Sequence, residues 1–221
     1  MYILNEDISF PHPSNANRRG LLAIGGDLSR ERLILAYSLG IFPWYNEGEP
    51  ISWYSLDPRM VLFPKNLKVS KSMKQVLDKK SFEITYDTAF KEVMTACGSV
   101  YRPGQGGTWI TDAMLNAYCD LHELGYAHSV EAWQDGELVG GLYGIAMGKC
   151  FFGESMFSKV SNASKAAFIT MVRELEAKGF LLIDCQMYTE HLESLGAALI
   201  PRTEFLAYLE ENRENEELLV F

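Results

Sequence analysis

The stretch His128-Ser-Val-Glu-Ala-Trp-Gln-Asp-Gly-Glu-Leu-Val-Gly-Gly-Leu-Tyr143 gives the clearest indication of the fold. Residues 128–134 and 137–143 alternate apolar and polar side chains and include β-branched and aromatic residues, as is typical of strands. The dipeptide Asp135-Gly136 between them is a favoured two-residue hairpin turn. The sequence therefore predicts an antiparallel β-hairpin here.

On both sides of this hairpin, strand and helix patterns follow one another. We expect further strands at residues 82–86, 149–152 and 180–185. We expect helices at residues 70–77, from Asp87 or Thr88 to about 97, from Thr111 to a stop at Gly125, and at about 163–178. This order predicts an α+β fold in which helices pack on a mixed sheet.

The first 64 residues differ from the rest of the chain. They contain six of the eight prolines, at positions 11, 13, 43, 50, 58 and 64, and proline disrupts helices and central strands. One helix is still expected between Ser29 as its cap and Gly40 as its end. We therefore predict a small amino-terminal domain over residues 1–64 and a larger domain over residues 65–221.

Composition is that of an ordinary globular protein. Of the 221 residues, 48% are hydrophobic and 22% are charged, which is enough apolar material for a core and argues against disorder. The longest apolar runs are far shorter than the roughly 20 residues that cross a bilayer, and no leader pattern is visible, so we expect a cytoplasmic protein without a membrane partner. The four cysteines have no zinc-ligand spacing, so we expect reduced, packed thiols and no metal.

Charge is unevenly distributed along the chain. The net charge of −9 argues against nucleic acid on average, because phosphate binding needs concentrated Lys and Arg. Residues 65–80, however, contain six lysines and one acidic residue, whereas residues 204–217 contain six glutamates and one Arg. A helix with Lys71 and Lys74 on its surface is usually a solvated face, but it could also follow a phosphate backbone.

One candidate site lies at the end of the expected strand Ile183-Asp-Cys-Gln186. Alternation places Asp184 and Gln186 on one face of a strand and Ile183 and Cys185 on the other. A carboxylate at the end of a buried strand commonly lies at a site, yet Asp also starts ordinary turns there. Cys185 has no assignable histidine partner, so we interpret it as a packed thiol rather than a nucleophile.

Two further signals remain ambiguous from the residues alone. Glu154 lies in the apolar run Phe151-Phe-Gly-Glu-Ser-Met-Phe157, where burial of an acid calls for a cation from the same chain or from a substrate. Trp44 and Trp109 lie in loops beside Gly or Pro, where they could pack in a core or stack on a nucleic-acid base.

Taken in order, these fragments resemble the bacterial leucyl/phenylalanyl-tRNA-protein transferase family over about residues 10–205. The matching segments include Gly20-Leu-Leu-Ala-Ile-Gly-Gly-Asp-Leu28, Ala36-Tyr37, Gly40-Ile-Phe-Pro-Trp44, Asp57-Pro-Arg59, Gly107-Thr-Trp-Ile110, Gly153-Glu-Ser-Met-Phe-Ser158 and Ile183-Asp-Cys-Gln186. The resemblance implies a carboxy-terminal domain of acetyltransferase-like (GNAT) fold. It also implies transfer of Leu or Phe, less readily Met, from aminoacyl-tRNA to proteins that begin with Arg or Lys. That reaction marks the acceptor for the N-degron pathway and needs no cofactor.

The resemblance also assigns roles to individual residues. Asp184 and Gln186 match the family's proton-handling pair, and Trp44 and Trp109 match aromatics that contact the terminal adenosine of tRNA. The pocket for the transferred side chain and its surroundings correspond to Leu142, Phe151, Gly153, Glu154, Met156 and Ile183. The family's basic helix corresponds to Lys71, Lys74, Lys79 and Lys80. Thr189 stands where the family can have an asparagine, so it receives no role.

Two alternative functions belong to other classes. An acetyl-CoA-dependent N-acyltransferase would need an [RQ]xxGx[GA] phosphate-binding run after a strand, and we find none in the sequence. A noncatalytic RNA-binding module would use the lysines and the two tryptophans, but it would leave Asp184, Gln186 and the apolar pocket unexplained. We therefore favour a monomeric aminoacyltransferase. Its tRNA ester is an activated donor, so positioning and one proton transfer suffice.

Overall fold

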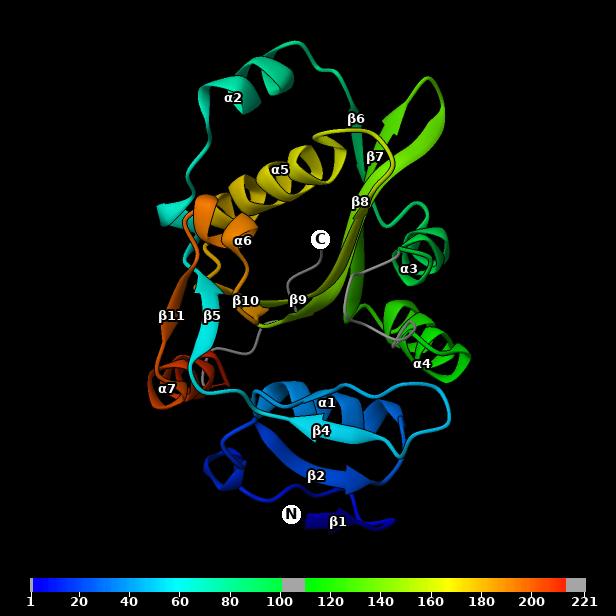
Figure 1. The fold of residues 1–221 in the computed structure, drawn as a ribbon, viewed down its shortest axis with the longest axis vertical. Coiled ribbons are helices and arrows are strands. Elements are labelled where there is room, and N and C mark those ends of the chain that lie inside the picture. Colours follow the sequence, from blue (N-terminus) through cyan, green and yellow to red (C-terminus); the bar gives the residue numbers. More distant parts are fainter. Residues whose placement is uncertain (1, 101–109, 214–221) are drawn as a thin grey trace.

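The computed structural model describes residues 2–100 and 110–213, which form two β-sheets (Figure 1). The smaller sheet has the strand order β1-β2-β4-β3. Its strands are β1 (Tyr2–Leu4), β2 (Leu21–Gly25), β3 (Phe42–Pro43) and β4 (Ser52–Tyr54). Helix α1 (Arg30–Ser38) lies between this sheet and the rest of the molecule (Figure 1).

The larger sheet has seven strands in the order β11-β5-β10-β9-β8-β7-β6. In chain order these are β5 (Arg59–Leu62), β6 (Glu83–Tyr86), β7 (Ala127–Gln134), β8 (Glu137–Met147), β9 (Cys150–Ser158), β10 (Leu182–Gln186) and β11 (Ala198–Ile200). Strands β9 and β10 are parallel, and the other neighbouring pairs are antiparallel. The sheet is mixed, which confirms the predicted α+β class.

Helices cover both faces of the larger sheet (Figure 1). The longest helix, α5 (Ala163–Ala177), packs on one face, and the opposite face carries α3 (Phe90–Gly98) and α4 (Asp112–Glu123). The remaining helices are α2 (Lys71–Asp78), α6 (Glu190–Ser194) and α7 (Arg202–Arg213), with short 3₁₀ turns at Pro13–Asn15 and Pro64–Asn66. One apolar core lies under α5, and a second is shared by α1, α3, α4 and α7. The amino-terminal region therefore has no separate core of its own.

The predicted hairpin is confirmed. Strands β7 and β8 pair from Ala127↔Ile145 to Gln134↔Glu137. The turn residues Asp135 and Gly136 have φ angles of 52° and 78°, as a two-residue turn that matches the twist of the strands requires.

Sheet membership changes before the expected boundary at residue 64. Strand β5 (Arg59–Leu62) precedes that boundary, but it pairs with β10 and β11 of the larger sheet. By sheet membership the chain crosses from the small sheet to the large one between Tyr54 and Arg59.

The predicted cap of helix α3 is wrong. The residue at the cap position is Ala89, and no side chain accepts a hydrogen bond from the first turn. Asp87 accepts the backbone N–H of Ser129 at 2.8 Å, and Thr88 donates to Glu131 at 3.0 Å, so both predicted caps bind strand β7 instead.

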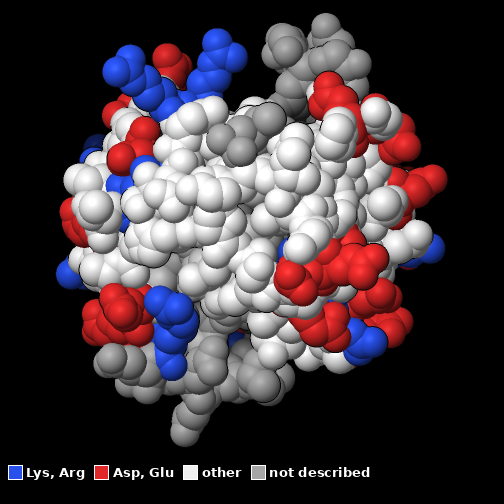
Figure 2. All heavy atoms as spheres, turned by 90° about the horizontal axis from the view of Figure 1, so that it is seen from below, with Lys and Arg blue, Asp and Glu red and all other residues white. Residues whose placement is uncertain are grey.

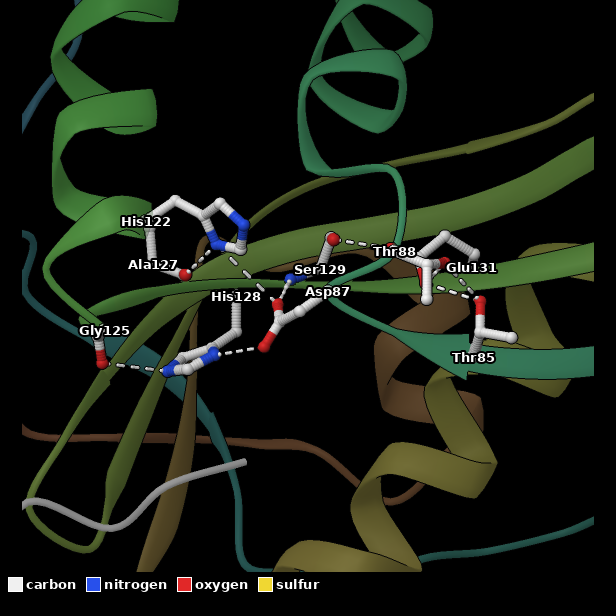
Figure 3. A network of polar contacts seen from close by, with 9 residues as sticks. All are labelled: Thr85, Asp87, Thr88, His122, Gly125, Ala127, His128, Ser129 and Glu131. Atoms are coloured by element: carbon white, nitrogen blue, oxygen red, sulfur yellow. Dashed lines mark hydrogen bonds and ion pairs between the residues drawn. The ribbon is translucent and has the colours of Figure 1, made fainter.

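These contacts belong to a polar network between β6, β7 and the start of α3 (Figure 3). Glu131 is fully buried and accepts hydrogen bonds from three hydroxyl groups, at 2.5 Å from Ser129, 2.7 Å from Thr85 and 3.0 Å from Thr88. The ring of His128 meets Asp87 at 2.8 Å on one side and the Gly125 carbonyl at 3.1 Å on the other. We call Thr85, Asp87, Thr88, His128, Ser129 and Glu131 the β6–β7 network.

The surface seen from the small-sheet side is uncharged over much of its centre, and acidic side chains gather along one side of it (Figure 2). Helix α2, which carries the predicted basic surface, lies at the opposite end of the molecule (Figure 1). Within the described part of the chain, no helix is long and apolar enough to span a bilayer.

Candidate active site

A cavity of about 290 Å³ opens between β8, β9, β10, α5 and α6. Its apolar lining comes from Leu142, Phe151, Met156, Phe168, Met171, Ile183 and Leu192, and its polar lining includes Glu154, Asp184, Gln186, Thr189 and His191. A cavity of this size, lined by both apolar and polar residues, suits a ligand that has an apolar side chain and a polar reacting group.

Strand register explains why the apolar residues meet. Leu142 of β8 is paired with Met156 of β9, and Phe151 of β9 is paired with Ile183 of β10. Side chains on one face of adjacent strands form a continuous surface, and here that surface faces α5. Gly144 makes room for this wall, because a Cβ at its position would lie 2.6 Å from the ring of Phe151.

All eight pocket and catalytic residues predicted by the resemblance, apart from the two tryptophans, line this cavity. They are Leu142, Phe151, Gly153, Glu154, Met156, Ile183, Asp184 and Gln186. Trp44 is not among the lining residues; it follows β3, is partly buried, and its ring lies 5.5 Å from that of Tyr54. Trp109 falls outside the described residues. The lysines at 71, 74, 79 and 80 are exposed on α2 and just after it, away from the cavity.

Asp184 is fully buried and bound by an arginine that the sequence analysis did not single out. Arg59 of β5 donates from Nε at 2.8 Å and from Nη2 at 2.6 Å to the two carboxylate oxygens. The guanidinium carbon lies 4.8 Å from the ring centre of Phe42 and 4.7 Å from that of Phe205. The charge of Asp184 is therefore compensated inside the protein, as a buried carboxylate requires.

Gln186 is connected to Asp184 through the backbone. Its N–H donates to Asp184 at 2.9 Å, and its own φ is +60°, a left-handed conformation that non-glycine residues rarely adopt. The register of β10 against β5 shifts at this point. Strict alternation consequently ends before Gln186, and Cys185 also borders the cavity. Burial raises the pKa of the Cys185 thiol, which keeps it neutral and supports its interpretation as a packed thiol.

The negative charge of Glu154 is balanced by neutral hydrogen-bond donors rather than by an arginine. Its Oε1 accepts a hydrogen bond from the Tyr37 hydroxyl at 2.8 Å and from the Gln186 side-chain amide at 2.9 Å. Burial raises the pKa of Glu154 to about 7, although the Tyr37 hydrogen bond opposes that rise. The Tyr37 hydroxyl is also hydrogen-bonded to that of Tyr118.

Two contacts of the candidate site were missed from the sequence. Tyr37 was taken as part of the apolar stripe of its helix, and Arg59 only as part of a matching motif. The contact of Tyr37 with Glu154 spans 117 positions, and that of Arg59 with Asp184 spans 125. The available signal was the presence of both residues in segments that match the family, Ala36-Tyr37 and Asp57-Pro-Arg59.

Among residues 2–100 and 110–213, no three His, Cys, Asp or Glu side chains gather in an arrangement that could hold a metal ion.

Comparisons with known proteins find the same family over almost the whole chain. The family model described as leucyl/phenylalanyl-tRNA protein transferase matches residues 61–210, and the model of its N-terminal domain matches residues 26–57. The leucyl/phenylalanyl-tRNA–protein transferase of Flavobacterium johnsoniae is 58% identical over 209 residues, which cover 95% of this chain and 99% of the relative. That of Nitrosospira multiformis is 60% identical over 210 residues, which cover 94% and 90%.

Solved structures are less similar. The structure of L-PGS from Bacillus licheniformis has a TM-score of 0.42 and 12% identity, with 78% of this chain and 57% of that one covered. A GCN5-related N-acetyltransferase from Kribbella flavida has a TM-score of 0.35 and 12% identity, with 76% and 59% covered.

Proposed function

The chain belongs to the leucyl/phenylalanyl-tRNA protein transferase family and is a tRNA-dependent aminoacyltransferase; on this premise we propose its substrates. It transfers Leu or Phe, and less readily Met, from aminoacyl-tRNA to the α-amine of proteins that begin with Arg or Lys. The transfer takes place in the cytoplasm, the enzyme acts as a monomer, and the new amino terminus marks the acceptor for N-degron degradation.

The observation that supports this proposal is the composition of the cavity. Leu142, Phe151, Met156 and Ile183 form an apolar wall, and Glu154 and Gln186 lie at its polar edge. Leu, Phe and Met differ in shape but all bury apolar surface, and a flexible Met in the wall suits such variety. A charged side chain would be buried there without a partner, so Asp-tRNA and Lys-tRNA are poor donors.

The polar edge supports an acyl transfer between an ester and an amine. Gln186 lies next to Glu154 and presents its amide to the cavity. Asp184 acts through Gln186, because its carboxylate holds the backbone N–H of that residue. In this proposal the pair positions the acceptor amine against the ester carbon and assists the movement of one proton.

Binding of tRNA is assigned to two separate surfaces. Lys71, Lys74, Lys79 and Lys80 are exposed and carry no acidic partner within ion-pair distance among the described residues. They bind the phosphate backbone, whereas Trp44, together with Trp109, contacts the terminal adenosine. Because each phosphate contact releases counterions, replacing the four lysines by Ala should weaken binding of any tRNA about equally and flatten its salt dependence.

The decisive experiment measures transfer of labelled Leu from Leu-tRNA to two peptides that differ only in their first residue, Arg or Ala. Labelling of the Arg peptide alone is expected. Transfer to neither peptide, or to both equally, would contradict the proposed function. Acetyl-CoA in place of Leu-tRNA serves as the control donor, and acetylation of the peptide would favour the alternative acyltransferase.

A further inference from the structure

Two carboxylates line the cavity, and the protein balances their negative charges differently. Asp184 has both oxygens bound by Arg59 and is fully buried. Glu154 is only partly buried and is hydrogen-bonded to a hydroxyl and an amide, both neutral. No Lys or Arg of the described residues lies within ion-pair distance of it. Glu154 is therefore the carboxylate of this pair whose charge no Lys or Arg among the described residues neutralises at contact distance.

Hydrogen-bond directions leave one oxygen of Glu154 available. The Tyr37 hydroxyl donates its proton to Oε1, so in the bond between the two tyrosines Tyr118 is the donor and Tyr37 the acceptor. The Gln186 amide donates to the same Oε1. Both of these bonds end on Oε1, Tyr118 also interacts with the Glu154 carboxylate, and Glu154 borders the cavity. Oε2 accepts from neither Tyr37 nor Gln186, so we assign it as the oxygen that meets a bound substrate.

Resting on the proposed function, we propose that Glu154 is the catalytic base of the transfer. Its Oε2 takes a proton from the acceptor's neutral α-amine while the nitrogen forms a bond to the ester carbon. The bond from that carbon to the ribose oxygen then breaks, and Glu154 returns the proton to the leaving oxygen. The amide and a free tRNA hydroxyl are the products, the carboxylate is regenerated, and no further reactant is consumed.

This role fits the acid–base properties of the site. A group that takes and returns a proton works best when its pKa lies near the working pH, and burial brings the pKa of Glu154 to about 7. Tyr37 and Tyr118 are positioning residues, since their chain of hydroxyl groups holds Oε1 of Glu154. Gln186 contributes both a bond to Glu154 and an amide oxygen that can accept from the attacking amine.

The test compares the pH dependence of kcat in wild type, Glu154→Gln, Glu154→Asp, Tyr37→Phe and the control Tyr208→Phe, which removes a hydroxyl outside the cavity. Glu154→Gln should lower kcat by about 10² to 10⁴-fold and leave only the acidic limb that the peptide amine itself produces. Glu154→Asp keeps a carboxylate, so it should retain an acidic limb that belongs to the protein. Tyr37→Phe should move that limb to higher pH, because the Tyr37 hydrogen bond lowers the pKa of Glu154. Tyr208→Phe should leave the profile unchanged. The peptide amine titrates alike in every variant, so a limb that moves belongs to the protein.

Three results would overturn this role. One is an acidic limb in Glu154→Gln that coincides with that of wild type. Another is an acidic limb that does not move in Tyr37→Phe, a result that also decides the matter if Glu154→Gln does not fold. The third is a Glu154→Gln variant whose KM for the Arg peptide rises while its kcat stays unchanged. Glu154 would then only bind the cationic group of the acceptor. A wild-type protein that transfers nothing to the Arg peptide would instead defeat the proposed function itself.

Discussion

Two glutamates inside this molecule have similar partners but different surroundings. Glu131 accepts hydrogen bonds from three hydroxyl groups of the β6–β7 network and is completely enclosed (Figure 3). Glu154 accepts one hydroxyl and one amide and borders a cavity. Neither is paired with a Lys or Arg in the described structure. Burial and neutral donors are common to both glutamates, so the feature that separates them is that only Glu154 borders the cavity.

The largest expected effect comes from removing the amide beside the accessible glutamate. Gln186→Ala should lower kcat for Leu transfer by about 10² to 10⁴-fold, because positioning and proton transfer are both impaired. Affinity for tRNA and the free energy of unfolding should change far less. Steady-state kinetics with the Arg peptide, together with a tRNA-binding titration, would check this. A variant with wild-type kcat would remove Gln186 from the chemistry.

The second prediction concerns the stability that Glu154 contributes at different pH values. Its folded-state pKa of about 7 lies above the ordinary 4.5, so the folded state holds the proton more tightly than the unfolded state. The contribution of Glu154 to the free energy of unfolding is therefore most favourable below pH 4.5, falls as pH rises from there to about 7, and is level above that. As pH rises through this window, the free energy of unfolding of Glu154→Gln should increase relative to that of wild type by on the order of 3 kcal/mol at most.

Urea denaturation of both proteins at pH 4.5 and pH 8 would measure the difference, because all other titrating groups are shared. If the free energy of unfolding changed equally between the two pH values in both proteins, the pKa of Glu154 would not be raised in the folded state.

The third prediction concerns the enclosed glutamate. In Glu131→Gln, one of the three hydroxyl donors meets an NH₂ group instead of an oxygen, so the free energy of unfolding should fall by about 1–3 kcal/mol. The value of kcat for the folded variant should stay at the wild-type level. Denaturant unfolding and kinetics on the same preparation test both parts. Loss of kcat without loss of stability would break the contrast between the two glutamates.

The smallest effect is expected at Cys185. This thiol borders the same cavity as Glu154, but burial raises its pKa and keeps it neutral at working pH. Cys185→Ala should therefore retain kcat. Mass spectrometry of wild type during turnover should find no aminoacyl group on the enzyme. A trapped aminoacyl-enzyme, or an inactive but folded variant, would show that the thiol attacks the ester.

Local sequence patterns predicted much of the fold, and the family resemblance predicted one wall of the site. The β7–β8 hairpin was predictable because alternation and the Asp135-Gly136 turn act over a few residues. The strand at 180–185 was predictable for the same reason, and the family resemblance identified the apolar residues of the cavity.

Partners that meet only through the tertiary fold were not predictable in this way. The 3.6-residue period places Tyr37 in an apolar stripe, and nothing near it in the sequence indicates that its hydroxyl will meet Glu154. Asp87 and Thr88 have the composition of helix caps, but a neighbouring strand offers them a buried amide and a buried carboxylate, and these bonds prevail. Local rules rank the bonds available nearby and cannot weigh those that folding brings from elsewhere.

The position of Arg59 has a consequence for how the molecule unfolds. Its guanidinium lies against Phe42 of the small sheet and Phe205 of α7 while it binds Asp184 of the large sheet. If the amino-terminal region melted first, this buried ion pair would lose its cover and be exposed to water. Melting of either region therefore weakens the other, and calorimetry should record one cooperative heat-absorption peak for the whole chain rather than two separate transitions.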